Sequence, residues 1–165
     1  MVALRKIEPT DLPFLYQWEN DASVWADADT HNPLSQQDLR DYIASTTGDI
    51  YRDRQLRLII GNDGAAIGCI DLFDFDPRNG KAAIGMYISP SERRKGIGKK
   101  ALELLEEYAF SHLRLRLLYA VISTRNEACS ALYRNAGYNP SSILKAWTIE
   151  SDARIWIKLN PMYNE

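Results

Sequence analysis

Five basic residues surround two glycines just after Pro90, in the segment of the chain best suited to binding an anion. They are Arg93, Arg94, Lys95, Lys99 and Lys100. Pro90 ends an expected strand, and an expected helix begins at Ile97, so the segment precedes a helix N-terminus. Free backbone N–H groups and the positive end of the helix dipole favour an anion there, and Gly96 and Gly98 would let a diphosphate approach the backbone. The segment predicts a phosphate-binding loop, and a capped helix with a solvated basic face is the alternative.

Two common nucleotide-binding motifs fit this segment poorly. Arg93 stands where a Walker loop has its first glycine, and Lys100 stands where that loop has Ser or Thr. The spacing of residues 96–101 matches a dinucleotide fingerprint, but residues 90–95 separate it from the preceding strand. The next expected strand also ends on residues 123–125, Ser-Thr-Arg, without the acid that would bind a ribose. A nicotinamide dinucleotide is therefore disfavoured.

A second motif follows about 30 residues later, where Asn126, Tyr133, Gly137 and Tyr138 have the pattern Asn-x6-Tyr-x3-Gly-Tyr. Together with Arg93-x-x-Gly96-x-Gly98, this pattern resembles the GNAT family of N-acetyltransferases. Either motif alone is weak evidence, whereas the two in this order, separated by an apolar strand, are specific. The resemblance covers nearly the whole chain.

The resemblance implies an α/β (α+β) fold with a mixed, mostly antiparallel seven-stranded sheet, helices on both faces, and a splayed central strand pair. It implies acetyl-CoA as the cofactor, with the pantetheine arm pairing with backbone between the parted strands. The residues implied to bind coenzyme A are Met86, Tyr87, Ile88, Arg93, Arg94, Lys95, Gly96, Ile97, Gly98, Lys99, Asn126 and Ser130.

Tyr133 is the residue that the resemblance implies as catalytic. It lies seven positions after Asn126, two turns along the same expected helix, so both residues face the same groove. A phenol at this point could donate a proton to the departing thiolate of coenzyme A. A helical tyrosine that only packs in the core is the alternative.

Acidic residues at the end of the first expected helix and beyond it could attract a cationic acceptor. Residues 1–80 contain 14 acids and 7 Lys or Arg, whereas residues 81–165 contain 8 acids and 13 Lys or Arg. Residues 18–24 resemble the same region of spermidine N-acetyltransferases and of ribosomal-protein N-terminal acetyltransferases. The expected acceptor is a polyamine or a peptide N-terminus, and a non-catalytic acyl-CoA-binding module is a further alternative. The predicted acceptor-binding residues are Glu19, Asp21, Asp27, Asp29 and Asp71.

The base that removes the proton from the amine is harder to identify. Related enzymes often carry a glutamate early in the fourth strand, but residues 81–85 contain no acid. Asp71 and Asp74 on the preceding strand are possible substitutes, and solvent-facing positions in an alternating strand are the alternative.

The elements that would position these residues follow from hydrophobic periodicity and turn signals, within a single domain spanning residues 1–165. Expected helices cover residues 11–20, 35–45, 97–112 and 126–135. Expected strands cover residues 2–6, 55–60, 65–75, 81–89 and 115–123, the last buried on both faces, with a closing hairpin at 143–149 and 153–159.

Composition excludes several other classes of protein. Hydrophobic residues make up 45% and charged residues 25% of the chain, as in ordinary globular proteins. No apolar run approaches the ~18 residues of a membrane span, and an isoelectric point near 5.7 without a basic stripe disfavours nucleic acid. Cys69 and Cys129 fit reduced thiols in the cytoplasm, and Cys and His are too few for a metal site. The family often assembles, so a homo-oligomer is expected.

Overall fold

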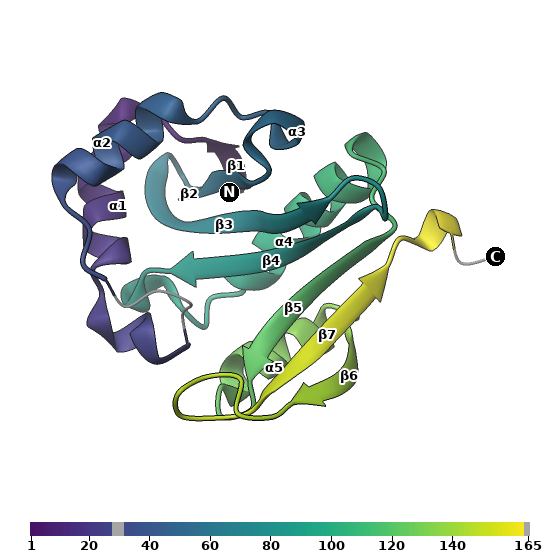
Figure 1. The fold of residues 1–165 in the computed structure, drawn as a ribbon. Helices are drawn as coiled ribbons and strands as arrows, with labels where there is room; N and C mark the ends of the chain where they lie inside the picture. Colours follow the sequence, from purple (N-terminus) through teal and green to yellow (C-terminus); the bar gives the residue numbers. More distant parts are fainter. Residues whose placement is uncertain (28–31, 164–165) are drawn as a thin grey trace.

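A computed structural model describes residues 1–27 and 32–163 and contains one seven-stranded mixed sheet (Figure 1), which confirms the predicted fold. The strand order is β1-β2-β3-β4-β5-β7-β6, and every pair except β4–β5 is antiparallel. The strands are β1 (Val2–Lys6), β2 (Leu56–Asn62), β3 (Ala65–Asp76), β4 (Lys81–Ile88), β5 (Leu117–Ser123), β6 (Asn139–Leu144) and β7 (Ala153–Leu159).

Side-chain caps begin two of the longer helices, α2 and α5. Ser35 Oγ accepts a hydrogen bond from Asp38 N (3.0 Å), and Asp38 Oδ2 accepts one from Ser35 N (2.8 Å), which forms a capping box. Asn126 caps the last α-helix with a single bond, since its Oδ1 accepts from Cys129 N (3.1 Å). The α-helices are α1 (Leu12–Glu19), α2 (Gln36–Ser45), α3 (Ile50–Asp53), α4 (Ile97–Glu107) and α5 (Glu127–Asn135). Shorter helical turns are η1 (Pro9–Asp11), η2 (Ala22–Asp27), η3 (Pro90–Glu92), η5 (Pro161–Tyr163) and the π-helical turn η4 (Tyr108–His112).

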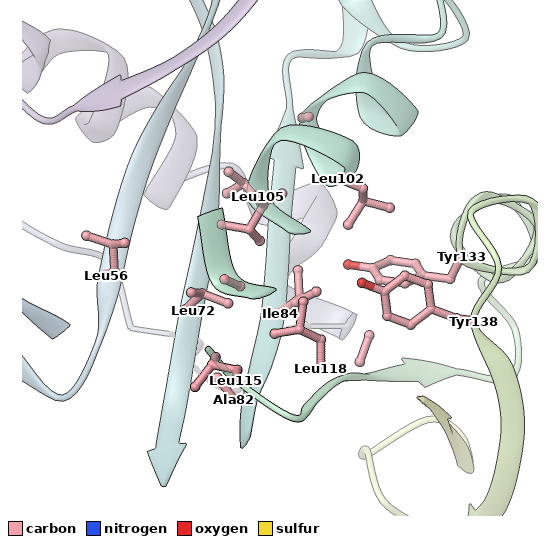
Figure 2. Close-up of a cluster of buried hydrophobic side chains, with 14 of the residues drawn as sticks. Leu56, Leu72, Ala82, Ile84, Leu102, Leu105, Leu115, Leu118, Tyr133 and Tyr138 are labelled. Carbon is pink, nitrogen blue, oxygen red and sulfur yellow. The ribbon is translucent and has the colours of Figure 1, made fainter. Parts of the chain in front are cut away.

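Two hydrophobic clusters lie on opposite faces of the sheet. On one face, α1 and α2 cover Ile59 of β2 and Cys69 of β3, and on the other α4 covers Ile60 and Ile70. Neighbouring strand residues thus point to opposite faces, as the pleat requires. The α4 cluster also includes Tyr133 and the residues around it (Figure 2). No helix within the described ranges is long and apolar enough to cross a membrane.

Strands β4 and β5 run parallel but pair over only three residues. Residues 81–83 of β4 pair with residues 117–119 of β5, whereas β4 continues to Ile88 and β5 to Ser123. Beyond this point the two strands diverge (Figure 1), which confirms the predicted splay. The diverging part of β4 leaves backbone N–H and C=O groups on the side that faces β5, and these can pair with an inserted ligand.

Two predictions about individual strands are wrong. The sixth strand was expected at 143–149, but β6 begins earlier and ends earlier, at Asn139–Leu144. Its first two residues pair with β7, and Ala146 takes a positive φ of 49° in the turn that follows it. Strand β5 is not buried on both faces. Leu118 is fully buried but Val121 is 38% exposed, because α1 and α2 pack over β2, β3 and β4 rather than over β5.

Gly68 of β3 holds β4 close to its neighbour. A Cβ at this position would lie 2.1 Å from Tyr87 O, inside any allowed contact distance. We expect Gly68→Ala to force β4 outward and lower the free energy of unfolding by about 1–3 kcal/mol, measured by urea denaturation. Gly61→Ala is the control, since its Cβ would lie 3.8 Å from the nearest atoms. Equal stability of the two variants would contradict the prediction.

Candidate active site

The loop between β4 and α4 has the geometry of an anion site. Gly96 is the N-cap of α4 with φ +78°, and a Cβ there would meet no atom within 4 Å. Across the described part of the chain, no side chain caps this helix, so its first N–H groups face outward. Gly98 also matters for packing. Its Cβ would lie 3.1 Å from Leu132 and 3.3 Å from Ile88, so glycine lets α4 pack against α5 and β4.

The basic side chains of the loop surround this helix end. Arg93 Nε donates to Ile88 O (2.8 Å), and its guanidinium lies 5.7 Å from the centre of the Tyr87 ring. Lys95 pairs with Glu92 at 3.2 Å. Arg94 and Lys99 are exposed on the same loop, whereas the Ile97 side chain is buried, so Ile97 can offer an anion only its backbone N–H.

Met86, Tyr87 and Ile88 occupy the diverging end of β4. Met86 and Ile88 pack toward the α4 cluster, whereas Tyr87 packs on the α1 face, 5.8 Å from the ring of Trp18. The Tyr87 hydroxyl donates to Asp21 Oδ2 (3.0 Å). Burial, reinforced by this hydrogen bond, raises the pKa of Tyr87 to about 12, so the phenol remains a donor. Tyr87 therefore connects β4 to the segment that follows α1.

Tyr133 lies in the α4 cluster with only 2% of its surface exposed (Figure 2). Its ring meets Tyr138 edge-on with centres 5.0 Å apart, and both phenols project from the α5 side toward the sheet. The same cluster contains Ile84, the first residue of β4 beyond its pairing with β5. Burial raises the pKa of Tyr133 well above its usual value of 10.0, so it holds its proton at neutral pH. Ser130, one turn earlier on α5, is also buried.

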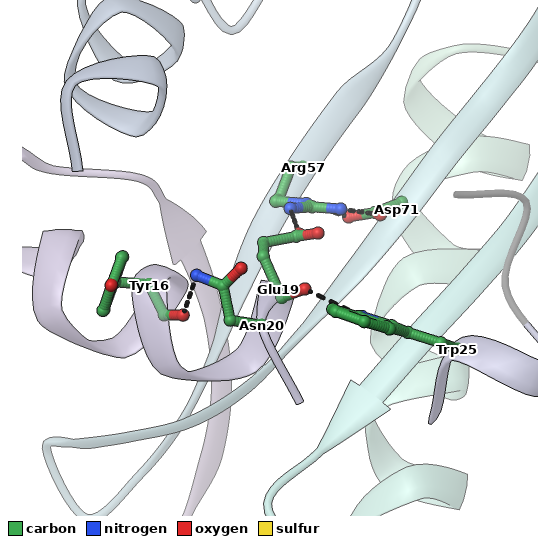
Figure 3. A network of polar contacts seen from close by, with 6 residues as sticks. All are labelled: Tyr16, Glu19, Asn20, Trp25, Arg57 and Asp71. Atoms are coloured by element: carbon green, nitrogen blue, oxygen red, sulfur yellow. Dashed lines mark hydrogen bonds and ion pairs between the residues drawn. The ribbon is translucent and has the colours of Figure 1, made fainter. Parts of the chain in front are cut away.

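Glu19 and Asp71 lie together on the face of the sheet opposite the α4 cluster, where Arg57 pairs with both (Figure 3). Arg57 Nε donates to Asp71 Oδ1 (2.8 Å) and Nη2 donates to Asp71 Oδ2 (2.7 Å), a bidentate pair, while Nη1 bonds Glu19 Oε1. The ring of Tyr42 lies 5.9 Å from the guanidinium carbon. Burial opposes the charge of Arg57, but the charge of Asp71 raises its pKa well above the usual value.

A cavity of about 260 Å³ opens beside this network. It contains three carboxylates, one guanidinium and a mainly apolar wall. Its lining residues are Glu19, Leu34, Asp38, Leu39, Tyr42, Gln55, Leu56, Arg57, Asp71, Leu72 and Phe73. A Cβ on Gly85 of β4 would lie 3.4 Å from Phe73 and 3.9 Å from Asp71 Oδ2. Because Gly85 is two residues beyond the last β4–β5 pair, the cavity adjoins the point where the strands part.

Several contacts fix Glu19 at the end of α1. Asn20 Nδ2 donates to Tyr16 O (2.9 Å) and Leu34 O (3.0 Å), which ties this end to the segment before α2. Trp25 Nε1 donates to Glu19 O (3.2 Å), as Figure 3 shows. The carboxylate of Glu19 therefore has a defined position between α1, η2 and the sheet.

The other predicted acceptor-binding acids are placed differently. Asp21 accepts hydrogen bonds from the Ser23 hydroxyl (2.6 Å) and N–H (3.0 Å), which lower its pKa and hold the start of η2. Asp29 and the side chain of Asp27 lie outside the described residues. Asp74 does not join Glu19 and Asp71. It has φ 46° where the β3–β4 register shifts, near the paired end of β4 and β5, and it lines a neighbouring cavity of about 430 Å³.

Sequence reasoning missed Arg57. The only available signal is that Arg57 and Asp71 occupy neighbouring expected strands, and their direct pairing depends on the β2–β3 register. Glu19 and Asp71 were both predicted to bind the acceptor, and the structure places them together. Both form ion pairs with Arg57.

Comparisons with known proteins agree with this geometry. A family model described as an acetyltransferase (GNAT) domain matches residues 2–139. Spermidine N(1)-acetyltransferase of Escherichia coli K12 is 28% identical over 141 residues, covering 84% of this chain and 73% of that protein. Spermidine N-acetyltransferase of Vibrio cholerae, solved with CoA and spermine, has a TM-score of 0.88 at 19% identity, covering 99% and 98% of the two chains. A dodecameric structure of the Vibrio cholerae enzyme has a TM-score of 0.84 at 19% identity, covering 99% and 96%.

Proposed function

Because the chain belongs to the GNAT acetyltransferase family, and is thus an acetyl-CoA-dependent N-acetyltransferase, we propose that its acceptor is a primary amine of a polyamine such as spermidine. The observation that carries this proposal is the acidic cavity beside Gly85, where β4 leaves β5. The name of the Escherichia coli relative supports the same acceptor.

The residues at the splay suit coenzyme A. The uncapped α4 N-terminus and the glycine at φ +78° leave an open cradle for a diphosphate, and basic side chains surround it. Diverging backbone at Met86, Tyr87 and Ile88 could pair with the pantetheine amides, as an added strand does. Asn126 and Ser130 on α5 would border the same groove. The residues assigned to the diphosphate are Arg93, Arg94, Lys95, Gly96, Ile97, Gly98 and Lys99.

When bound, acetyl-CoA supplies an activated acetyl thioester. Tyr133 is one residue of this chain that takes part in the chemistry. Its protonated phenol donates a proton to the leaving group, the thiolate of coenzyme A. Asp71 is unsuited to be the base, because Arg57 Nε and Nη2 already donate to both of its carboxylate oxygens. The proton of the amine then passes to another carboxylate of the cavity, Glu19 or Asp38, or to water.

The charge and shape of the cavity fit an aliphatic polycation. Glu19, Asp38 and Asp71 outweigh Arg57, which leaves a formal charge of -2 when all four are ionised. Leu34, Leu39 and Phe73 provide apolar wall for methylene groups.

The same apolar wall favours a protein N-terminus as the second candidate acceptor. A leucine-lined cavity could hold the first side chains of a peptide, and Arg57 has N–H groups beyond the three whose bonds are described above.

An acceptor panel tests the two candidates. Purified protein is incubated with acetyl-CoA and spermidine, spermine, putrescine or peptides with free N-termini, and released thiol is measured. We expect the highest kcat/KM with polyamines. Turnover of peptides without turnover of polyamines would replace the proposed acceptor, and thiol release with neither would refute both.

We also propose that the protein works as a homo-oligomer in the cytoplasm. The Vibrio cholerae neighbour is described as a dodecamer, and no disulfide joins Cys69 and Cys129. Sedimentation at several protein concentrations tests the assembly.

A further inference from the structure

We infer that Arg57 is a specificity-determining residue: its guanidinium occupies a cation position inside the acceptor cavity and limits how much positive charge the acceptor can bring. This inference rests on the proposed function. It concerns which amines are preferred, and not whether amines are acetylated.

The surroundings of Arg57 are those of a bound alkylammonium group. The Asp71 and Glu19 carboxylates contact it from two sides, and the Tyr42 ring lies 5.9 Å away. Carboxylates and an aromatic face are the groups that hold organic cations in proteins. The chain's own cation therefore fills the place that an acceptor ammonium would otherwise take.

The carboxylate oxygens that remain set the charge that an acceptor can match. Both oxygens of Asp71 bond Arg57, whereas among the described residues Glu19 bonds it through one oxygen (Figure 3). Asp38 adds a carboxylate at the α2 side of the cavity. With a formal charge of -2, the cavity matches a diamine such as putrescine better than the tetraamine spermine.

Removing the arginine charge should shift this preference. Arg57→Gln frees the Asp71 carboxylate and makes the formal cavity charge -3, so a more highly charged acceptor gains. We expect the ratio of kcat/KM for spermine over putrescine to rise about fivefold. Arg57→Lys, which retains the charge, should keep the ratio within about twofold of the original.

Arg40→Gln is the matched control. It removes one positive charge from an exposed face of α2, where the bonds that Arg40 forms within the described part of the chain go to Gln36 and Gln37, and we expect an unchanged ratio. A purely structural role for Arg57 predicts a different pattern, since a disturbed fold lowers kcat/KM for every amine by a similar factor.

A second variant tests the role of cavity charge even if Arg57→Gln does not fold. Glu19→Gln lowers the formal charge of the cavity to -1 and should reduce the spermine-to-putrescine ratio about fivefold. The inference is overturned when either folded variant leaves the ratio unchanged or moves it in the opposite direction. If the original protein acetylates no polyamine, the proposed function is refuted instead.

Discussion

Tyr133→Phe is expected to lower kcat for acetyl transfer about 100-fold, because the phenol is the proposed proton donor and general acid catalysis contributes factors of this size. The Kd for coenzyme A should stay within about twofold, since the ring and its packing remain. Stopped-flow or steady-state thiol release gives kcat, and calorimetric titration gives Kd. Unchanged kcat would remove Tyr133 from the mechanism.

Tyr138→Phe is the matched control for this experiment. Tyr138 is as buried as Tyr133, with 2% of its surface exposed, and packs directly against it, but it has no assigned role in the chemistry. We expect its kcat to stay within about threefold of the original. Equal losses in the two variants would point to a packing effect.

The pH dependence provides a further check on Tyr133. Burial raises its pKa well above 10.0, so the phenol stays protonated throughout the neutral range. The loss caused by Tyr133→Phe should therefore be constant between about pH 6 and pH 9. A loss that disappears as the pH rises through this range would show that the phenol titrates there.

Gly96→Asp is expected to raise the Kd for coenzyme A about 30-fold. A negative charge at the N-cap of α4 would repel the diphosphate with a free energy of about 2 kcal/mol after screening. Crowding within the protein does not contribute, because a Cβ there meets no protein atom within 4 Å. The loss should shrink at high salt, which titrations at two ionic strengths measure.

Gly96→Asn separates charge from backbone strain. Asn and Asp have similar size and tolerate a φ of +78° about equally, so both variants experience the same strain. We expect the Asn variant to bind coenzyme A within about threefold of the original. Equal weakening by Asn and Asp would assign the effect to strain, and full affinity in both would place the diphosphate elsewhere.

Local chemistry explains why the cofactor side could be predicted from the sequence. The Ser35 and Asn126 caps and the Gly96 turn depend on residues a few positions apart, so their patterns are visible in the chain. The short η2 helix was missed, because a segment of six residues is too short to give a clear periodic signal.

The acceptor side depended on contacts between distant residues. Glu19 and Asp71 were recognisable as acids, but their pairing with Arg57 joins residues 38 and 14 positions apart. A shift of one residue in the β2–β3 register would place Arg57 on the other face of the sheet. The docking of α1 then decides whether Glu19 reaches the guanidinium.

The sequence by itself determined the family through two motifs, and it determined the order of the strands and of the longer helices and the glycine turn before α4 through short-range periodicity, capping and glycine conformation. Tertiary structure alone decided that Arg57 pairs with Glu19 and Asp71 in the proposed acceptor cavity, that Asp74 lies at the paired end of β4 and β5, and that Val121 is exposed. The physical reason is that charge pairing and burial depend on contacts between elements that are distant in the sequence. Strand register and helix docking determine these contacts.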